Sequence, residues 1–62
     1  MLIDKIKEQI RVSFFPNGKV KTEILNGNNY IHYYGNGEIK LQMINGVYEE
    51  FNSKGELTWP KK

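Results

Sequence analysis

Turn signals recur every eight to ten residues along most of this chain, and they restrict it to short segments joined by tight connections. Segments of this length suit strands better than helices. We therefore predict an all-β fold, an antiparallel meander of about five to six short strands near residues 10–15, 19–24, 29–34, 38–43, 47–52 and 56–59. The signals are Pro16-Asn17-Gly18, Asn26-Gly27, Gly35-Asn36-Gly37, Asn45-Gly46 and Lys54-Gly55.

The composition supports this fold class. The 62 residues include no alanine but seven asparagines and six glycines, which favour turns over helices. A chain of this length forms one domain with a small core. We divide it into an N-terminal segment (1–9), β-hairpins (10–59) and a basic tail (60–62). The first ten residues fit either a short helix or a strand, and we favour a helical or irregular start that becomes a strand near Ile10.

The geometry of the turns sets the expected strand register. Pro16 fixes φ near −65°, which suits a type I turn followed by a left-handed Gly18 and gives a three-residue loop. The same loop at 35–37, 44–46 and 53–55, with a four-residue loop at 25–28, gives one consistent register. The predicted pairs are Phe14–Val20, Val20–Tyr33, Tyr33–Ile39, Ile31–Leu41, Met43–Val47 and Phe51–Leu57.

This register sorts the side chains into an apolar face and a polar face. A one-layer sheet needs a cover for its apolar face, and Leu2, Ile3 and Ile6, closure into a partial barrel, or a second copy of the chain could supply it. The expected core face holds Val12, Phe14, Val20, Thr22, Ile24, Ile31, Tyr33, Ile39, Leu41, Met43, Val47, Phe51, Leu57 and Trp59, with Glu49 as a misfit. The opposite face holds Lys19, Lys21, Glu23, Tyr30, His32, Tyr34, Glu38, Lys40, Gln42, Tyr48, Glu50, Asn52, Glu56 and Thr58.

Residues 14–21 and 33–40 are near copies of each other, each with two aromatics, an Asn-Gly turn, an aliphatic residue and a lysine. This pattern resembles the MORN-variant repeats of YwqK-like antitoxin proteins. The resemblance implies an array of β-hairpins that acts by binding other proteins. The chain departs from the family at residues 28–32 and 47–50, where family repeats usually carry a Gly-x-Trp element.

Six side chains of the polar face form the candidate binding site: Lys21, Tyr30, His32, Tyr34, Lys40 and Tyr48. Exposed tyrosines on a rigid sheet, surrounded by charges, are typical of protein-binding hot spots. The alternative is a solvated face on which the tyrosines serve only as good strand formers.

We expect no catalytic, metal or cofactor site. His32 is the only histidine, there is no cysteine, and in the predicted register the nearest hydroxyl, Ser13, lies two strands from it. Adjacent Glu49 and Glu50 point to opposite faces of a strand, so they cannot act as an acid–base pair.

The leading hypothesis is a small non-catalytic protein-binding module that occludes its partner, such as an antitoxin or a phage or mobile-element inhibitor of a host enzyme or defence complex. The alternative is a sheet that binds single-stranded nucleic acid through the tyrosines, Lys21, Lys40 and the basic tail. Without Lys61 and Lys62 the acidic and basic residues are equal in number, which weakens that alternative. We expect a cytoplasmic protein without a membrane span, and a homodimer is a further hypothesis.

Overall fold

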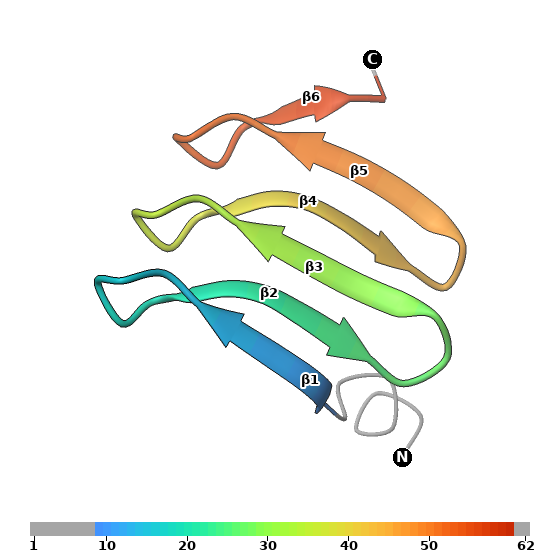
Figure 1. The fold of residues 1–62 in the computed structure, drawn as a ribbon. Coiled ribbons are helices and arrows are strands. Elements are labelled where there is room, and N and C mark those ends of the chain that lie inside the picture. Colours follow the sequence, from blue (N-terminus) through green and yellow to red (C-terminus); the bar gives the residue numbers. More distant parts are fainter. Residues whose placement is uncertain (1–8, 61–62) are drawn as a thin grey trace.

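The computed structural model describes residues 9–60, which form one antiparallel sheet. Its six strands lie side by side in chain order, so the predicted all-β meander is confirmed (Figure 1). The helical start considered for residues 1–9 falls outside the described part, apart from Gln9 in the first strand. No described residue belongs to a helix that could cross a membrane. The strands are β1 (Gln9–Phe14), β2 (Val20–Leu25), β3 (Asn29–Tyr33), β4 (Ile39–Ile44), β5 (Val47–Phe51) and β6 (Leu57–Trp59).

Three turns of one design lie along one side of the sheet, where they join β1 to β2, β3 to β4 and β5 to β6 (Figure 1). In the first, Phe15 N donates to Lys19 O at 2.8 Å and Gly18 N donates to Phe15 O at 2.9 Å, and the other two repeat both bonds. The glycines have φ of 89°, 95° and 88°, a region that other residues enter only at a cost. The predicted loops at 16–18, 35–37 and 53–55 are confirmed.

Asparagine side chains connect these three turns. Asn17 Nδ2 donates to Gly35 O in the second turn at 3.0 Å, and Asn36 Nδ2 donates to Ser53 O in the third at 2.9 Å. Each asparagine also accepts, through Oδ1, a bond from the main-chain N–H two residues further on in its own turn. Lys54 occupies the equivalent position of the third turn, so the series of amide bonds ends there. The repeated motif therefore joins hairpins as well as closing each one.

Replacing Asn36 by alanine removes both of its bonds, one within the turn and one between turns. Because the side chain is exposed and water can replace part of the loss, we expect the free energy of unfolding to fall by about 1 kcal/mol. Urea denaturation followed by circular dichroism measures the change. Lys54→Ala, at the equivalent position without an amide, serves as the control, and equal losses in the two variants would contradict a role for the asparagine series.

The two turns on the other side of the sheet are shorter than predicted. Asn45 and Gly46 alone form the β4–β5 turn, and their φ values of 52° and 80° are those a type I′ turn requires. The β2–β3 loop consists of residues 26–28. The predicted loops at 44–46 and 25–28 are each one residue too long, because Asn-Gly favours the two-residue turn and Asn28 also adopts a positive φ of 65°.

A β-bulge follows each of the three similar turns. In β2, Phe14 pairs with Val20 but Ser13 pairs with Thr22, so Lys21 has no partner residue. Lys40 in β4 and Thr58 in β6 are skipped in the same way. Such an extra residue inverts the alternation of side chains beyond it. The predicted pairs Phe14–Val20, Tyr33–Ile39 and Phe51–Leu57, next to the turns, are confirmed, whereas Val20–Tyr33, Ile31–Leu41 and Met43–Val47 are wrong.

The observed register defines two faces, since residues directly opposite each other share a face. The aliphatic face carries Val12, Phe14, Val20, Glu23, Leu25, Ile31, Tyr33, Ile39, Gln42, Ile44, Val47, Glu49, Phe51 and Leu57. The tyrosine face carries Arg11, Ser13, Thr22, Ile24, Tyr30, His32, Leu41, Met43, Tyr48, Glu50 and Trp59.

The bulges and the shorter loops change the predicted membership of both faces. Five residues assigned to the core face lie on the tyrosine face: Thr22, Ile24, Leu41, Met43 and Trp59. In exchange, Glu23 and Gln42 lie on the aliphatic face. Each face therefore mixes apolar and polar side chains.

Within residues 9–60 the sheet has no second layer. The molecule measures 16 Å in its thinnest direction, and the described residues buried from solvent are Leu25 and Asn29, which are 3% and 4% exposed. Among the described strands β1 and β6 lie at the two edges and do not pair with each other, so these strands do not close into a barrel. Leu2, Ile3 and Ile6, which we considered as a cover, lie outside the described residues. Most apolar side chains of both faces are thus partly open to solvent.

Candidate functional site

The structure places three of the predicted site residues together on the tyrosine face. Tyr30 and His32 are next-but-one neighbours on β3, with their ring centroids 5.6 Å apart and their planes at 73°. Met43 of β4 lies opposite Tyr30 and also opposite Tyr48 of β5. The two tyrosines therefore flank a half-buried methionine across three adjacent strands, which forms an aromatic and thioether surface.

The two predicted lysines occur at the bulges and line one hollow beside His32. Lys21 and Lys40 are the unpaired residues of β2 and β4, and both line a hollow of about 360 Å³ together with His32, Leu41, Phe15 and Tyr33. Both lysines are exposed. Because a bulge redirects a side chain from its regular place in the sheet, the repeated bulge brings two cations to one site.

Tyr34 has a different role from the other predicted residues. Its hydroxyl donates to the main-chain oxygen of Phe51 at 2.7 Å, so it links the β3–β4 turn to β5. Lys40 Nζ lies 6.0 Å from the centroid of its ring, within reach of a cation–π interaction. Tyr34 thus supports the position of Lys40, and its own hydroxyl is engaged inside the protein.

Hydrogen bonds hold the polar groups of the tyrosine face in place. Thr22 Oγ1 and His32 Nδ1 are hydrogen-bonded at 3.1 Å, and Tyr48 Oη donates to Glu50 Oε2. The bond to Glu50 is the main reason why the pKa of Tyr48 is raised above its ordinary value. The nearest hydroxyl to His32 is therefore that of Thr22, not Ser13 as predicted, since the predicted register put Thr22 on the other face.

The tyrosine face includes two candidate binding residues that were not predicted from the sequence. Trp59 is 51% exposed, and Arg11 is exposed on the same face. With Lys21 and Lys40, Arg11 gives this side three cations, whereas Glu50 is its one carboxylate among the strand residues. In each of the three similar turns, the last glycine is followed by a charged residue, an aliphatic residue and then the bulged lysine or threonine. Recognising this pattern would have predicted the face on which Trp59 lies.

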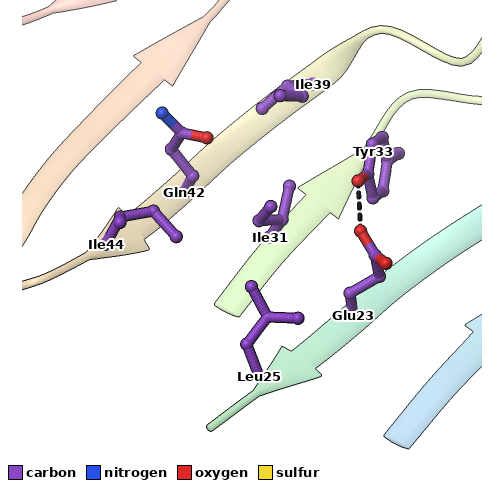
Figure 2. Close-up of a pocket in the computed structure, with 7 residues that line it drawn as sticks. All are labelled: Glu23, Leu25, Ile31, Tyr33, Ile39, Gln42 and Ile44. Atoms are coloured by element: carbon purple, nitrogen blue, oxygen red, sulfur yellow. Dashed lines mark hydrogen bonds between the residues drawn. The ribbon is translucent and has the colours of Figure 1, made fainter. Parts of the chain in front are cut away.

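The aliphatic face holds a larger hollow of about 480 Å³ (Figure 2). Its walls are mainly aliphatic, and Gln42 Nε2 beside it donates to Glu49 Oε1 at 2.8 Å. At one end the hydroxyl of Tyr33 donates to Glu23 Oε1. The hollow is lined by Glu23, Leu25, Ile31, Tyr33, Ile39, Gln42 and Ile44. None of these is a predicted site residue, because Tyr33 was assigned to the core and Glu23 and Gln42 to the opposite face.

Burial, reinforced by the bond to Glu23, raises the pKa of Tyr33 from 10.0 to about 12. The folded protein therefore favours the neutral phenol, and this contribution to stability is complete below pH 10 and is lost as the pH rises through 12. We expect Tyr33→Phe to be less stable than the wild type at pH 8, with the difference shrinking between pH 10 and 12. Denaturant titrations across this range measure it, and a constant difference would contradict the assigned pKa.

Within residues 9–60 there is no group of three or more His, Cys, Asp or Glu side chains that could hold a metal ion. His32 Nδ1 has a hydroxyl partner in Thr22 Oγ1. No family model, curated protein or solved structure matches this chain. The resemblance to MORN-variant repeats stays a prediction that rests on the two near copies.

Proposed function

We propose that this protein is a non-catalytic binding module that captures another protein against its tyrosine face. The observation that carries the proposal is the open single layer, in which Tyr30, Tyr48 and Trp59 are held on one surface without a covering layer among residues 9–60. Tyrosine and tryptophan dominate binding energies at protein interfaces because they bring a large contact area at a low entropic cost.

The charges of this face indicate the kind of partner. Arg11, Lys21 and Lys40 add three cations to this side of the sheet, on β1, β2 and β4, and Glu50, the one carboxylate among the strand residues of the tyrosine face, accepts a bond from Tyr48. A complementary surface would be acidic around an apolar centre. Binding there would occlude the partner's own surface, which agrees with an antitoxin or an inhibitor carried by a phage or mobile element and directed at a host enzyme or defence complex.

The experiment uses two matched charge reversals. The first variant carries Lys21→Glu and Lys40→Glu on the tyrosine face, and the second carries Lys19→Glu and Lys54→Glu at the turns; all four lysines are exposed. Partners are captured from a lysate with the wild type and identified by mass spectrometry, and the dissociation constant of each variant is then measured. We expect the first variant to bind at least tenfold more weakly and the second to bind within threefold of the wild type.

Equal losses of affinity in the two charge-reversal variants would overturn the proposed face.

Trp59→Ala gives a second measurement, with Val47→Ala as its control, because both side chains are largely exposed but lie on opposite faces. We expect weaker capture with the first only. If single-stranded DNA or RNA bound tightly at low salt, with an affinity falling steeply as salt rises, the partner class would instead be nucleic acid.

A further inference from the structure

The two edges of the sheet differ in how well they are protected. Native proteins guard an edge strand by making it short or by placing proline and charges along it. β6 has only three residues and is followed by Pro60, which has no N–H to offer. β1 has six residues without proline or glycine, and Arg11 is its only charged side chain. Within residues 9–60, β1 is therefore the less protected edge and the better candidate to pair with another strand.

We propose that two copies of this chain pair through β1, antiparallel and about a twofold axis at Val12. In this register Arg11 of each copy lies opposite Ser13 of the second copy, so the guanidinium meets a hydroxyl on the tyrosine face. Val12 lies opposite Val12 of the second copy, and Phe14, which is 57% exposed in the single chain, lies across from Ile10, which is 65% exposed and falls in the irregularity between Gln9 and Arg11. Cross-strand pairs of this kind are the contacts that stabilise a sheet.

Other registers of β1 against itself fit less well. An axis at Arg11 places two guanidinium groups directly opposite each other, which is destabilising. An axis at Ser13 places Arg11 opposite the aromatic Phe15, where the first turn begins. The irregularity between Gln9 and Arg11 limits regular pairing at the start of β1, so the pairing centres on the residues after it. The sequence of β1 is thus self-complementary in one register.

Pairing in this way would extend the sheet and would keep the like faces of both copies on the same side. The axis at Val12 runs perpendicular to the sheet, so both tyrosine faces would be presented together. Arg11 lies on this face in each copy, next to the joined edges. The dimer would therefore carry two binding surfaces in one plane, which increases the avidity for a partner with repeated sites.

The test is sedimentation velocity of the full chain at concentrations from about 1 μM to 1 mM, since one strand edge buries less area than a typical stable complex and we expect a micromolar dissociation constant. The wild type should form dimers within this range. Ser13→Lys places two additional cations opposite arginines and should weaken the dimer about tenfold. Ser13→Glu should strengthen it, and Arg11→Glu with Ser13→Lys should restore dimerisation by exchanging the charges.

The side chains of Arg11 and Ser13 are exposed in the single chain, so circular dichroism should show that each variant folds. Ser53→Lys, an exposed serine in the third turn, is the control and should dimerise as the wild type does. A monomer at every concentration, an assembly larger than a dimer, or a dimer indifferent to substitutions at Ser13 and Arg11 would each overturn the proposal.

Discussion

Leu25→Ala is expected to lower the free energy of unfolding by about 2 to 3 kcal/mol. Leu25 is the one buried apolar side chain among the described residues, and it forms part of the wall of the hollow on the aliphatic face. Truncation of a buried leucine costs the transfer energy of the lost methyl groups and leaves a cavity. We place the cost at the lower end of the usual range because the adjoining hollow is open to solvent.

This loss is large for so small a domain, whose total stability is roughly 3 to 9 kcal/mol at the ordinary value per residue. Urea denaturation followed by circular dichroism measures it. Ile24→Ala is a matched control, since Ile24 is the neighbouring residue but lies exposed on the tyrosine face. We expect that variant to lose less than about 1 kcal/mol. If the two losses were equal, the assignment of Leu25 to the core would be wrong.

Asn29→Ala is expected to cost about 2 to 3 kcal/mol, because it leaves two main-chain groups without partners. Asn29 is buried at the start of β3, where its Nδ2 donates to Asn26 O at 2.6 Å and its Oδ1 accepts from Asn45 N at 2.7 Å. It thereby joins the two turns on its side of the sheet, as Asn17 and Asn36 join the turns on the other side.

Two variants separate the bonds of Asn29. Asn29→Asp keeps an acceptor for Asn45 but loses the donor to Asn26 O, so we expect a loss of intermediate size. Asn26→Ala retains the main-chain oxygen that Asn29 uses and should change the free energy of unfolding by less than about 0.5 kcal/mol. The measurement is again denaturant unfolding, and a neutral Asn29→Ala would contradict the bridging role.

The sequence was sufficient to predict the strands and the three turns that are each followed by a bulge. Pro16 and the glycine after each Asn or Lys set the loop of three residues, and the pair next to each of these turns was predicted correctly. Local dihedral preferences decide such features, so they are visible in a short segment. Asn45-Gly46 carried the same kind of signal, but the consistent register that we preferred gave it one residue too many.

The register beyond the bulges was not predictable by alternation alone. An unbulged β4 gathers Ile39, Leu41 and Met43 on one face, which separates apolar from polar residues better than the structure does. The bulge at Lys40 instead places Leu41 and Met43 with Tyr30 and His32. A pattern that assumes one buried face and one solvated face misses this, because here both faces of the single layer carry apolar side chains.

The sequence predicted only part of the candidate site, and the bulges explain much of the rest. Tyr30, His32 and Tyr48 were placed on a common face, and the structure brings them together there. Trp59 was missed because its face depends on the bulge at Thr58. Arg11 follows the plain alternation of β1 and was left out of the predicted site for no structural reason. The charge reversals at Lys21 and Lys40 test whether this face binds a partner.

The methyl group of Met43 tests the central claim, that bulges assemble the tyrosine face, most directly. Nuclear Overhauser contacts of this methyl group can be measured with selective methyl labelling of the methionines. The structure predicts contacts with the rings of both Tyr30 and Tyr48, which lie opposite Met43 on its two neighbouring strands. Contacts with the side chains of Asn29 and Ile31 in place of the ring of Tyr30, as β4 without the bulge at Lys40 requires, would contradict the account.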